Sequence, residues 1–445
     1  MKSLRRDWNQ FWFAPIASVP LGLFRLVFGA LVLTSGLLLF PDRAVWFSER
    51  GLFPLKAMHL YNVFWFAPRL ALLQHVQDER LLTLFFLIFL CGALCLLLGL
   101  WTRAAALVVF LGLNALHARD GAILNAGDAL MRAMSFYLLL APAGAACSLD
   151  RLRRLLRGRE PEVPPTVVAW PVRLMQIQVV LVYLCTALSK ISGALWQNGT
   201  AIYYPLHLTQ MRRFPLPWVD GDHLWLINLL THGTVVIEFA LATLLWVPRL
   251  RLYVLAAGVL LHLGIEYSLN VPLFSFLMIT SYLLFLTPTD VGLFVAGVSA
   301  RFANARLRLA WEGLSPPPVL VPRLVRFFDA FRLISLWDDR TSASANRRAR
   351  SRQQARALND ASATTSTTSA TNIRAVDLQG HSRTGLVAVR ALLWRLPALW
   401  VVAPLLFLPG AARAWNKLSS HVISPADSVP STGPAALQER ESLPV

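Results

Sequence analysis

Lys190 is the side chain of this sequence with the clearest potential for chemistry. Only four of the 42 Lys and Arg residues are lysines, and Lys190 ends an apolar run, in LCTALSKISGALW. A lysine in an apolar pocket can lose its proton because desolvation disfavours its charge, whereas an arginine stays charged. The position therefore predicts a neutral amine that acts as a base. The alternative is a lysine that only extends its ammonium to the membrane surface.

His262 and Glu266 form a second candidate group. They are four residues apart in one apolar run, so a helix places them on the same face. A histidine there can carry a proton or donate a hydrogen bond to a bound cofactor or headgroup. A structural hydrogen bond is the alternative interpretation.

A third polar group lies in the segment HARDGAILNAGD, residues 117–128, between two apolar runs. Its candidates for contact with a ligand are His117, Asn125 and Asp128. Asp128 also stands where the next helix should begin, and a carboxylate at that position interacts favourably with the helix dipole. Helix capping therefore explains Asp128 without any chemistry.

Arg25, Arg132 and Glu238 also lie within or at the ends of apolar runs. Charge at membrane depth is costly, so each is a candidate functional residue. The alternatives are a structural ion pair and an end-of-helix residue that extends its charge to the membrane surface. The sequence has no GxGxxG, GxxxxGK, CxxC or HExxH motif, so nucleotide binding, dithiol redox chemistry and zinc hydrolysis lack local support. All four cysteines fall inside apolar stretches, and no metal site is expected.

These residues are embedded in a very apolar chain. Of its 445 residues, 56% are hydrophobic and 15% are charged, and the mean hydropathy is +0.53. Soluble globular chains carry about a quarter charged residues, so the composition excludes an ordinary soluble enzyme and indicates a membrane protein. The apolar runs predict an all-α, multi-pass fold of about eight spans, at residues 20–40, 81–100, 104–117, 128–146, 172–190, 224–247, 252–267 and 271–287.

Basic residues fall on one side of the predicted spans, at positions 2–6, 103, 151–159 and 249–251. Such residues favour the cytoplasmic side, so both termini should lie in the cytoplasm. The expected location is a cell membrane, such as the bacterial inner membrane. Lys190 and His262 then lie toward the outer side. This topology also accounts for the net charge of +18, and no nucleic-acid partner is expected.

The composition changes after residue 290, where a small cytoplasmic module should begin. The predicted organisation is a transmembrane domain at 1–290 and a linker with the start of a tail module at 291–340. A disordered linker at 341–371 follows, then the tail at 372–420 and a disordered C-terminus at 421–445. Within the tail, residues 373–378 read as a strand and residues 386–418 as a helix interrupted by prolines.

The sequence resembles the horizontally transferred transmembrane (HTTM) domain, the membrane domain shared with vitamin K-dependent gamma-carboxylase. The likeness covers residues from about 15 to 290, and the pattern SK…W…G…YY is its most specific part. It is carried by HARDGAILNAGDALMRAMSFYLLLAPAGAACSLD (117–150), QIQVVLVYLCTALSKISGALWQNGTAIYY (176–204) and HLGIEYSLNVPLFSFLMITSYLLFLTP (262–288).

The resemblance implies a membrane enzyme that oxidises reduced vitamin K, or a related quinone, with molecular oxygen and couples this to addition of carbon dioxide to glutamate. In that family a lysine matching Lys190 deprotonates the hydroquinone, and a histidine matching His262 assists in the site. The candidate contacts for the quinone are His117, Asn125, Asp128, Trp196 and Glu266.

The chain also departs from the carboxylase. It has Asp128 where that enzyme has a histidine, and Ser189 and Lys190 where that enzyme has two lysines. Nothing after residue 290 corresponds to its large extracytoplasmic domain, so recognition of a protein or peptide substrate outside the cytoplasm stays open. The alternative function is a non-enzymatic membrane carrier or binding protein for a quinone or lipid, and a third is a scaffold organised by the tail. Membrane lipids are expected partners, and the oligomeric state is open.

The tail more weakly resembles a thiol-disulfide oxidoreductase domain of the DCC type. The likeness lies in VLVPRLVRFFDAFRLISLW (319–337) and DLQGHSRTGLVAVRALLWRLPALWVVAPLLFLPG (377–410). The defining Asp-x-x-Cys-x-x-Cys signature is missing, and no cysteine follows Cys185. The resemblance implies a tail without redox activity that serves docking or regulation.

Overall fold

The computed structural model divides the chain into two compact units, unit 1 at Met1–Leu293 and unit 2 at Phe294–Val445. The predicted disordered segments, 341–371 and 421–445, lie outside the described residues. The structure describes residues 2–52, 54, 72–76, 78–121, 123–161, 163–214, 216, 223–302, 307–312, 334–337, 372–377 and 382–394.

In its described residues unit 1 is helical, with one small pair of strands, β1 (Pro15–Ala17) and β2 (Thr166–Val168), which are antiparallel. Its first helices are α1 (Lys2–Phe13), α2 (Val19–Leu39), α3 (Arg43–Phe47), η1 (Leu72–His75), α5 (Glu79–Leu98), α6 (Thr102–Arg119), α7 (Ala126–Leu140) and α8 (Leu149–Leu156). Those that follow are α9 (Trp170–Ile191), α10 (Ala194–Gln197), α11 (Tyr203–His207), α12 (Leu224–Thr243), η3 (Leu244–Trp246), α13 (Arg251–Ser268), α14 (Phe274–Ser281), η4 (Tyr282–Phe285) and α15 (Pro288–Arg301).

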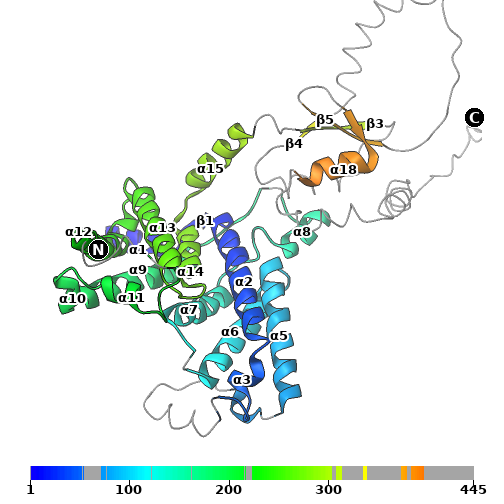
Figure 1. The fold of residues 1–445 in the computed structure, drawn as a ribbon. Coiled ribbons are helices and arrows are strands. Elements are labelled where there is room, and N and C mark those ends of the chain that lie inside the picture. Colours follow the sequence, from blue (N-terminus) through cyan, green and yellow to red (C-terminus); the bar gives the residue numbers. More distant parts are fainter. Residues whose placement is uncertain are drawn as a thin grey trace, which may run out of the picture. The chain divides into compact units, whose positions relative to one another are not determined.

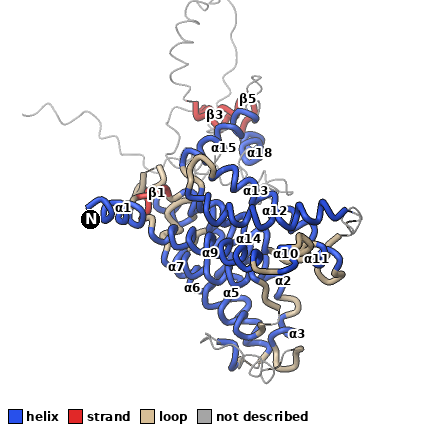
Figure 2. Tube along the Cα trace, turned by 90° about the vertical axis from the view of Figure 1, so that its left-hand side faces the viewer, coloured by secondary structure: helices blue, strands red, loops and turns tan. Residues whose placement is uncertain are grey.

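Successive long helices of unit 1 pack against one another, from α2 through α5, α6, α7, α9, α12 and α13 to α14 (Figures 1 and 2). Phe24 and Phe28 of α2 and Phe86 and Phe89 of α5 are buried between them. A Cβ atom at Gly29 would lie 2.7 Å from the backbone of Leu97, so glycine is what lets α2 and α5 approach so closely.

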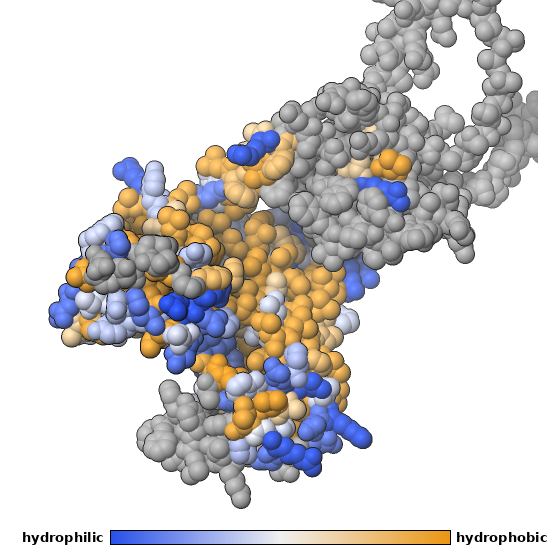
Figure 3. Space-filling model, in the orientation of Figure 1, coloured by the Kyte–Doolittle hydropathy of each residue, from blue (hydrophilic) through white to orange (hydrophobic). Residues whose placement is uncertain are grey.

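Part of the surface of unit 1 is strongly apolar. Hydrophobic side chains cover the visible faces of α2 and α5, and hydrophilic ones gather at their end beside α3 (Figure 3). Large hydrophobic residues of these helices, among them Leu38, Leu84 and Ile88, are more than half exposed. Such a surface is stable when lipid, rather than water, surrounds it.

The predicted number of eight spans is not confirmed. A helix lies at each of the eight predicted positions, but only four of the described helices are long and apolar enough to cross a membrane. They are Val19–Leu39, Glu79–Leu98, Trp170–Ile191 and Leu224–Trp246, with a fifth if the bent pair Phe274–Phe285 and Pro288–Arg301 counts as one span. The helix α7 has 15 residues and α14 has eight, which is too short for a perpendicular crossing of about 20 residues.

Arg25 has a structural role in this bundle. Its side chain is fully buried, and it donates hydrogen bonds to the carbonyl oxygens of Leu96 and Leu97 at 2.5 and 2.9 Å and of Cys147 at 2.5 Å. The first two carbonyls belong to the last turn of α5, where the carbonyl oxygen of Leu96 also accepts from the amide of Gly99 at 3.2 Å. Arg25 therefore caps α5 from inside the bundle, a structural role that differs from the expected alternatives of an ion pair or a side chain that extends to the membrane surface.

The described residues of unit 2 contain the end of α15, which begins in unit 1, a small mixed sheet and one further helix. Strand β3 (Leu307–Glu312) pairs parallel with β4 (Ile334–Trp337) and antiparallel with β5 (Asn372–Asp377), which pairs in turn with β6 (Ser382–Thr384). The helix α18 (Gly385–Trp394) packs on β5. A strand was expected where β5 lies, whereas β3 and β4 fall in residues expected to be a linker and the start of the tail.

Candidate functional site

Lys190 lies on the buried face of α9. This face carries Gln176, Val179, Tyr183 and Ala187 at helical spacing, and all four are buried. Lys190 follows three residues later, at the end of the helix, so the same face presents its side chain to the neighbouring helix α12.

Glu238 of α12 is the partner of Lys190. The ammonium nitrogen Nζ lies 2.6 Å from both carboxylate oxygens of Glu238. The side chain of Glu238 is 10% exposed and that of Lys190 is 20% exposed. In such surroundings each charge requires the other, because an unpaired ion away from water is strongly disfavoured.

His262 of α13 is joined to two tyrosines. Its ring nitrogen Nε2 lies 2.7 Å from the hydroxyl of Tyr183, which lies 2.6 Å from the hydroxyl of Tyr282 in η4. All three side chains are at most 4% exposed. A chain of hydroxyl and imidazole groups can reorient its hydrogen bonds and so pass a proton along its length.

The ion pair and the hydrogen-bonded chain form one cluster, here named the polar centre: Tyr183, Lys190, Glu238, His262 and Tyr282. Tyr183 and Lys190 share one face of α9. Helices α9, α12, α13 and the η4 segment together position the five side chains.

A glycine on α13 makes room for the cluster. Gly258 lies one turn before His262, and a Cβ atom there would clash with the hydroxyl of Tyr282. Gly264 lies on the same helix, and a Cβ atom there would meet nothing within 4 Å. Gly258 is therefore needed by the polar centre, whereas Gly264 is not.

Two features of the polar centre bear on ligand binding. The second ring nitrogen of His262, Nδ1, is buried and has no hydrogen-bond partner within the described residues. The ammonium of Lys190 lies 5.2 Å from the ring centroid of Trp196 in α10. A ligand with a hydroxyl group and an aromatic ring could satisfy the imidazole and pack in these apolar, aromatic surroundings.

Glu266 is held outside the polar centre by a partner that the sequence did not reveal. Its Oε1 lies 2.5 Å from Nη1 of Arg213, a residue of the segment between α11 and α12. The backbone of that segment also bonds to the end of α13, from Arg213 to Ser268 and from Asn270 to Met211. Glu266 thus fastens the connecting segment to α13.

Asn125 and Asp128 form a capping box at the start of α7. The Asn125 side chain accepts a hydrogen bond from the Gly127 amide at 2.7 Å, and Asp128 accepts one from the Asn125 amide at 2.8 Å. Capping accounts for both side chains. The cap lies close to α14, because a Cβ atom at Gly127 would approach Phe274, whose ring packs 5.6 Å from that of His262.

His117 is buried near the end of α6, and its Nδ1 has no hydrogen-bond partner within the described residues. No described contact joins it to the polar centre. The structure therefore brings together Lys190, Trp196 and His262, while Glu266, Asn125 and Asp128 have structural partners. These geometries leave their roles in ligand binding as predictions.

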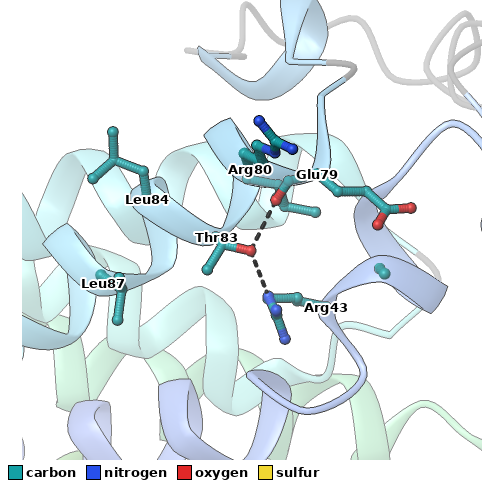
Figure 4. Close-up of a pocket in the computed structure, with 8 residues that line it drawn as sticks. Arg43, Glu79, Arg80, Thr83, Leu84 and Leu87 are labelled. Carbon is teal, nitrogen blue, oxygen red and sulfur yellow. Dashed lines mark hydrogen bonds between the residues drawn. The ribbon is translucent and has the colours of Figure 1, made fainter.

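Sequence reasoning missed Tyr183 and Tyr282, because a tyrosine in an apolar run is most simply explained as part of the core. Among the described residues, no group of three or more His, Cys, Asp or Glu side chains could hold a metal ion. A separate pocket between α3 and α5 is lined by none of the candidate residues; in it Arg43 donates to the hydroxyl of Thr83 at 3.0 Å (Figure 4).

Comparison with known proteins identifies the helical part of the chain. A family model described as HTTM domain matches residues 13–289, and the match stops before the tail, so the likeness of the tail to DCC domains stays a prediction. The chain is 27% identical over 131 residues to the sporulation-delaying protein SdpB of Bacillus subtilis (strain 168). That alignment covers 28% of this chain and 40% of the relative. No solved structure matches the chain.

Proposed function

This chain belongs to the HTTM domain family, and from that membership we infer that its polar centre is a site for a reduced quinone, at which Lys190 acts as the base. The HTTM domain occurs in vitamin K-dependent carboxylase and in SdpB-like membrane proteins. The observation that carries the proposal is the pairing of one base candidate, Lys190, with a carboxylate that can take its proton.

The residues of the polar centre fit such a ligand. A hydroquinone is a flat aromatic ring with two hydroxyl groups, and the unpartnered Nδ1 of His262 offers one hydrogen bond to a hydroxyl. Trp196 supplies an aromatic face beside Lys190. We propose four further contacts for the quinone, at His117, Asn125, Asp128 and Glu266.

Lys190 can become a base by giving its proton to Glu238. The two oxygens of Glu238 lie at hydrogen-bond distance from Nζ, so a proton can pass directly from the ammonium to the carboxylate. The free amine then accepts the proton of a hydroquinone hydroxyl. His262 holds that hydroxyl in place. Tyr183, which bonds to Tyr282, fixes the orientation of the imidazole ring of His262.

A reduced naphthoquinone supplies the oxidisable group, and its reaction with one molecule of oxygen yields the quinone epoxide and one molecule of water. Coupling of this reaction to addition of carbon dioxide to a glutamate side chain is the further step that the family resemblance suggests. We also propose that the basic end of unit 1 faces the cytoplasm, which places the polar centre toward the outer half of the membrane.

A non-enzymatic quinone carrier is the second candidate function. It is favoured by the closeness of the Lys190–Glu238 contact, because a lasting ion pair would hold Lys190 in its charged form. In this case Lys190 and His262 contact the headgroup of the ligand without taking its proton. Binding without turnover would distinguish the carrier from the enzyme.

The test is whether purified full-length protein converts a reduced naphthoquinone to its epoxide in air. Epoxide formed in proportion to enzyme would support the proposal, and carbon dioxide fixed into an added glutamate peptide would extend it to carboxylation. Saturable quinone binding without epoxide would favour the carrier. The control is the Gly264→Ala variant, because that position is open.

A further inference from the structure

A cavity lies at the start of α9, at the opposite end of this helix from Lys190 of the polar centre. Its volume is about 310 Å³, which is at the lower end of the range for small-molecule sites. Arg173 lines it at the start of α9, and Lys190 ends the same helix, so roughly 25 Å of helix separates the two sites. The walls come from α1, β1, the starts of α2 and α9, the segment from η3 into α13, and η4 with the residues after it.

Arg173 is held over this cavity with its charge unneutralised. Its guanidinium lies 4.7 Å from the ring centroid of Phe11 and 5.8 Å from that of Trp246. It donates to the carbonyl oxygen of Phe11 at 3.2 Å and to Oε1 of Gln176 at 2.8 Å. No carboxylate in the described part of the chain pairs with it, so its charge is available to a ligand.

Arg251 adds a second guanidinium to the same cavity. Its Nη2 lies 2.8 Å from Asp290, yet its Nε is buried and has no hydrogen-bond partner within the described residues. The described residues that line the cavity include no Asp or Glu. One paired and one unpaired guanidinium therefore line a cavity whose described lining contains no carboxylate.

Most of the rest of the lining is apolar. Ile16, Leu21 and Leu284 contribute to the walls. The segments that meet here are linked by direct contacts, from Ala169 to Ala14 and from Ser18 to Pro165. The cavity thus lies where α2 and α9 begin to cross the membrane.

We propose that this cavity binds the phosphate headgroup of an acidic phospholipid. Arginine guanidinium groups bind phosphate oxygens with charge-assisted hydrogen bonds, and Arg173 and Arg251 offer two such groups. The apolar walls contact the glycerol backbone and the first methylene groups of the lipid chains. A free phosphate ion would use only the arginines, so it is the competing occupant that the experiment must separate.

The experiment measures lipid binding to the purified full-length protein in an uncharged detergent by native mass spectrometry. Phosphatidylglycerol is titrated against phosphatidylcholine, with inorganic phosphate as a competitor. The variants are Arg173→Gln and Asp290→Asn. The matched control is Arg159→Gln, because Arg159 is an exposed residue of the same basic end that does not line the cavity.

Phosphatidylglycerol should bind more tightly than phosphatidylcholine, and Arg173→Gln should weaken it about fivefold, the effect of one cation beside an anionic lipid. Arg159→Gln should leave it unchanged. Asp290→Asn should tighten it, because it frees the charge of Arg251, and this variant decides the matter if Arg173→Gln does not fold. Equal losses in Arg173→Gln and Arg159→Gln, or displacement of the lipid by equimolar inorganic phosphate, would overturn the proposal.

Discussion

The carboxylate of Glu238 holds the ammonium of Lys190 between its two oxygens, although 48 residues separate them in the chain. The contact joins α9 to α12 within the apolar part of unit 1. Each of the two charges is stable in this position only when the other is present, since either ion alone would be buried without a partner.

Removal of one member of this pair should therefore cost more than removal of both. Glu238→Gln leaves Lys190 without its counter-charge, and we expect a loss of about 3 kcal/mol in the free energy of unfolding. The double variant Lys190→Met with Glu238→Gln should be more stable than Glu238→Gln alone by at least about 1 kcal/mol, because neither ion is then buried without a partner. The measurement is thermal unfolding in detergent of the single and double variants. Strictly additive losses would show that the two residues do not interact.

Gly258 and Gly264 provide a matched pair of substitutions on α13. Gly258→Ala should lower the melting temperature and reduce quinone turnover, because the new methyl group would displace the hydroxyl of Tyr282. Gly264→Ala should be neutral or stabilising by up to about 1 kcal/mol, because alanine favours the helix and the site is open. Differential scanning fluorimetry of both proteins checks this. Equal tolerance of the two changes would mean that Tyr282 is not packed against Gly258.

Arg25 should be needed for stability and not for chemistry. Arg25→Met leaves the carbonyl groups of Leu96, Leu97 and Cys147 without their charged donor, and we expect a loss of at least about 3 kcal/mol. Arg103→Met, at an exposed position, is the control and should change stability little. An Arg25→Met protein that unfolds at the same temperature as the control would refute the capping role.

The sequence was enough to predict a helical membrane domain, because apolar runs and clustered arginines are local signals. Lys190 and His262 were singled out for the same reason, since ionisable residues in apolar runs stand out, and their roles stay predictions. Tyr183 and Tyr282 were not found, because their hydroxyl groups gain meaning only when three helical elements bring them together. The sequence also could not predict that Glu238 is the partner of Lys190, because pairing between residues of different helices depends on how the helices pack.

The tail shows the same limit. Strand β3 finds its neighbours β4 and β5 far along the chain, and no short-range pattern reveals such pairing. A protein truncated after residue 340 would therefore lack β5, β6 and α18, and the edge of β3 that pairs with β5 would be left without a neighbour. A stop after residue 302 would remove the whole sheet.

We expect the shorter protein, ending at residue 302, to remain monodisperse and to retain any quinone turnover. The protein ending at residue 340 should aggregate more, because it exposes an unpaired strand edge. Size-exclusion chromatography in detergent and an epoxide assay compare the two. Loss of turnover in a stable, monodisperse protein that ends at residue 302 would show that unit 2 takes part in the reaction.

The most direct test of the central claim is quinone turnover in Lys190→Arg. Arginine keeps the positive charge and can still pair with Glu238, so the fold should survive, but it cannot be deprotonated to serve as a base. The account predicts that this variant inserts and melts as the unchanged protein does, binds the reduced naphthoquinone, and forms no epoxide. Epoxide formation by Lys190→Arg at the rate of the unchanged protein would contradict a role for Lys190 as the base.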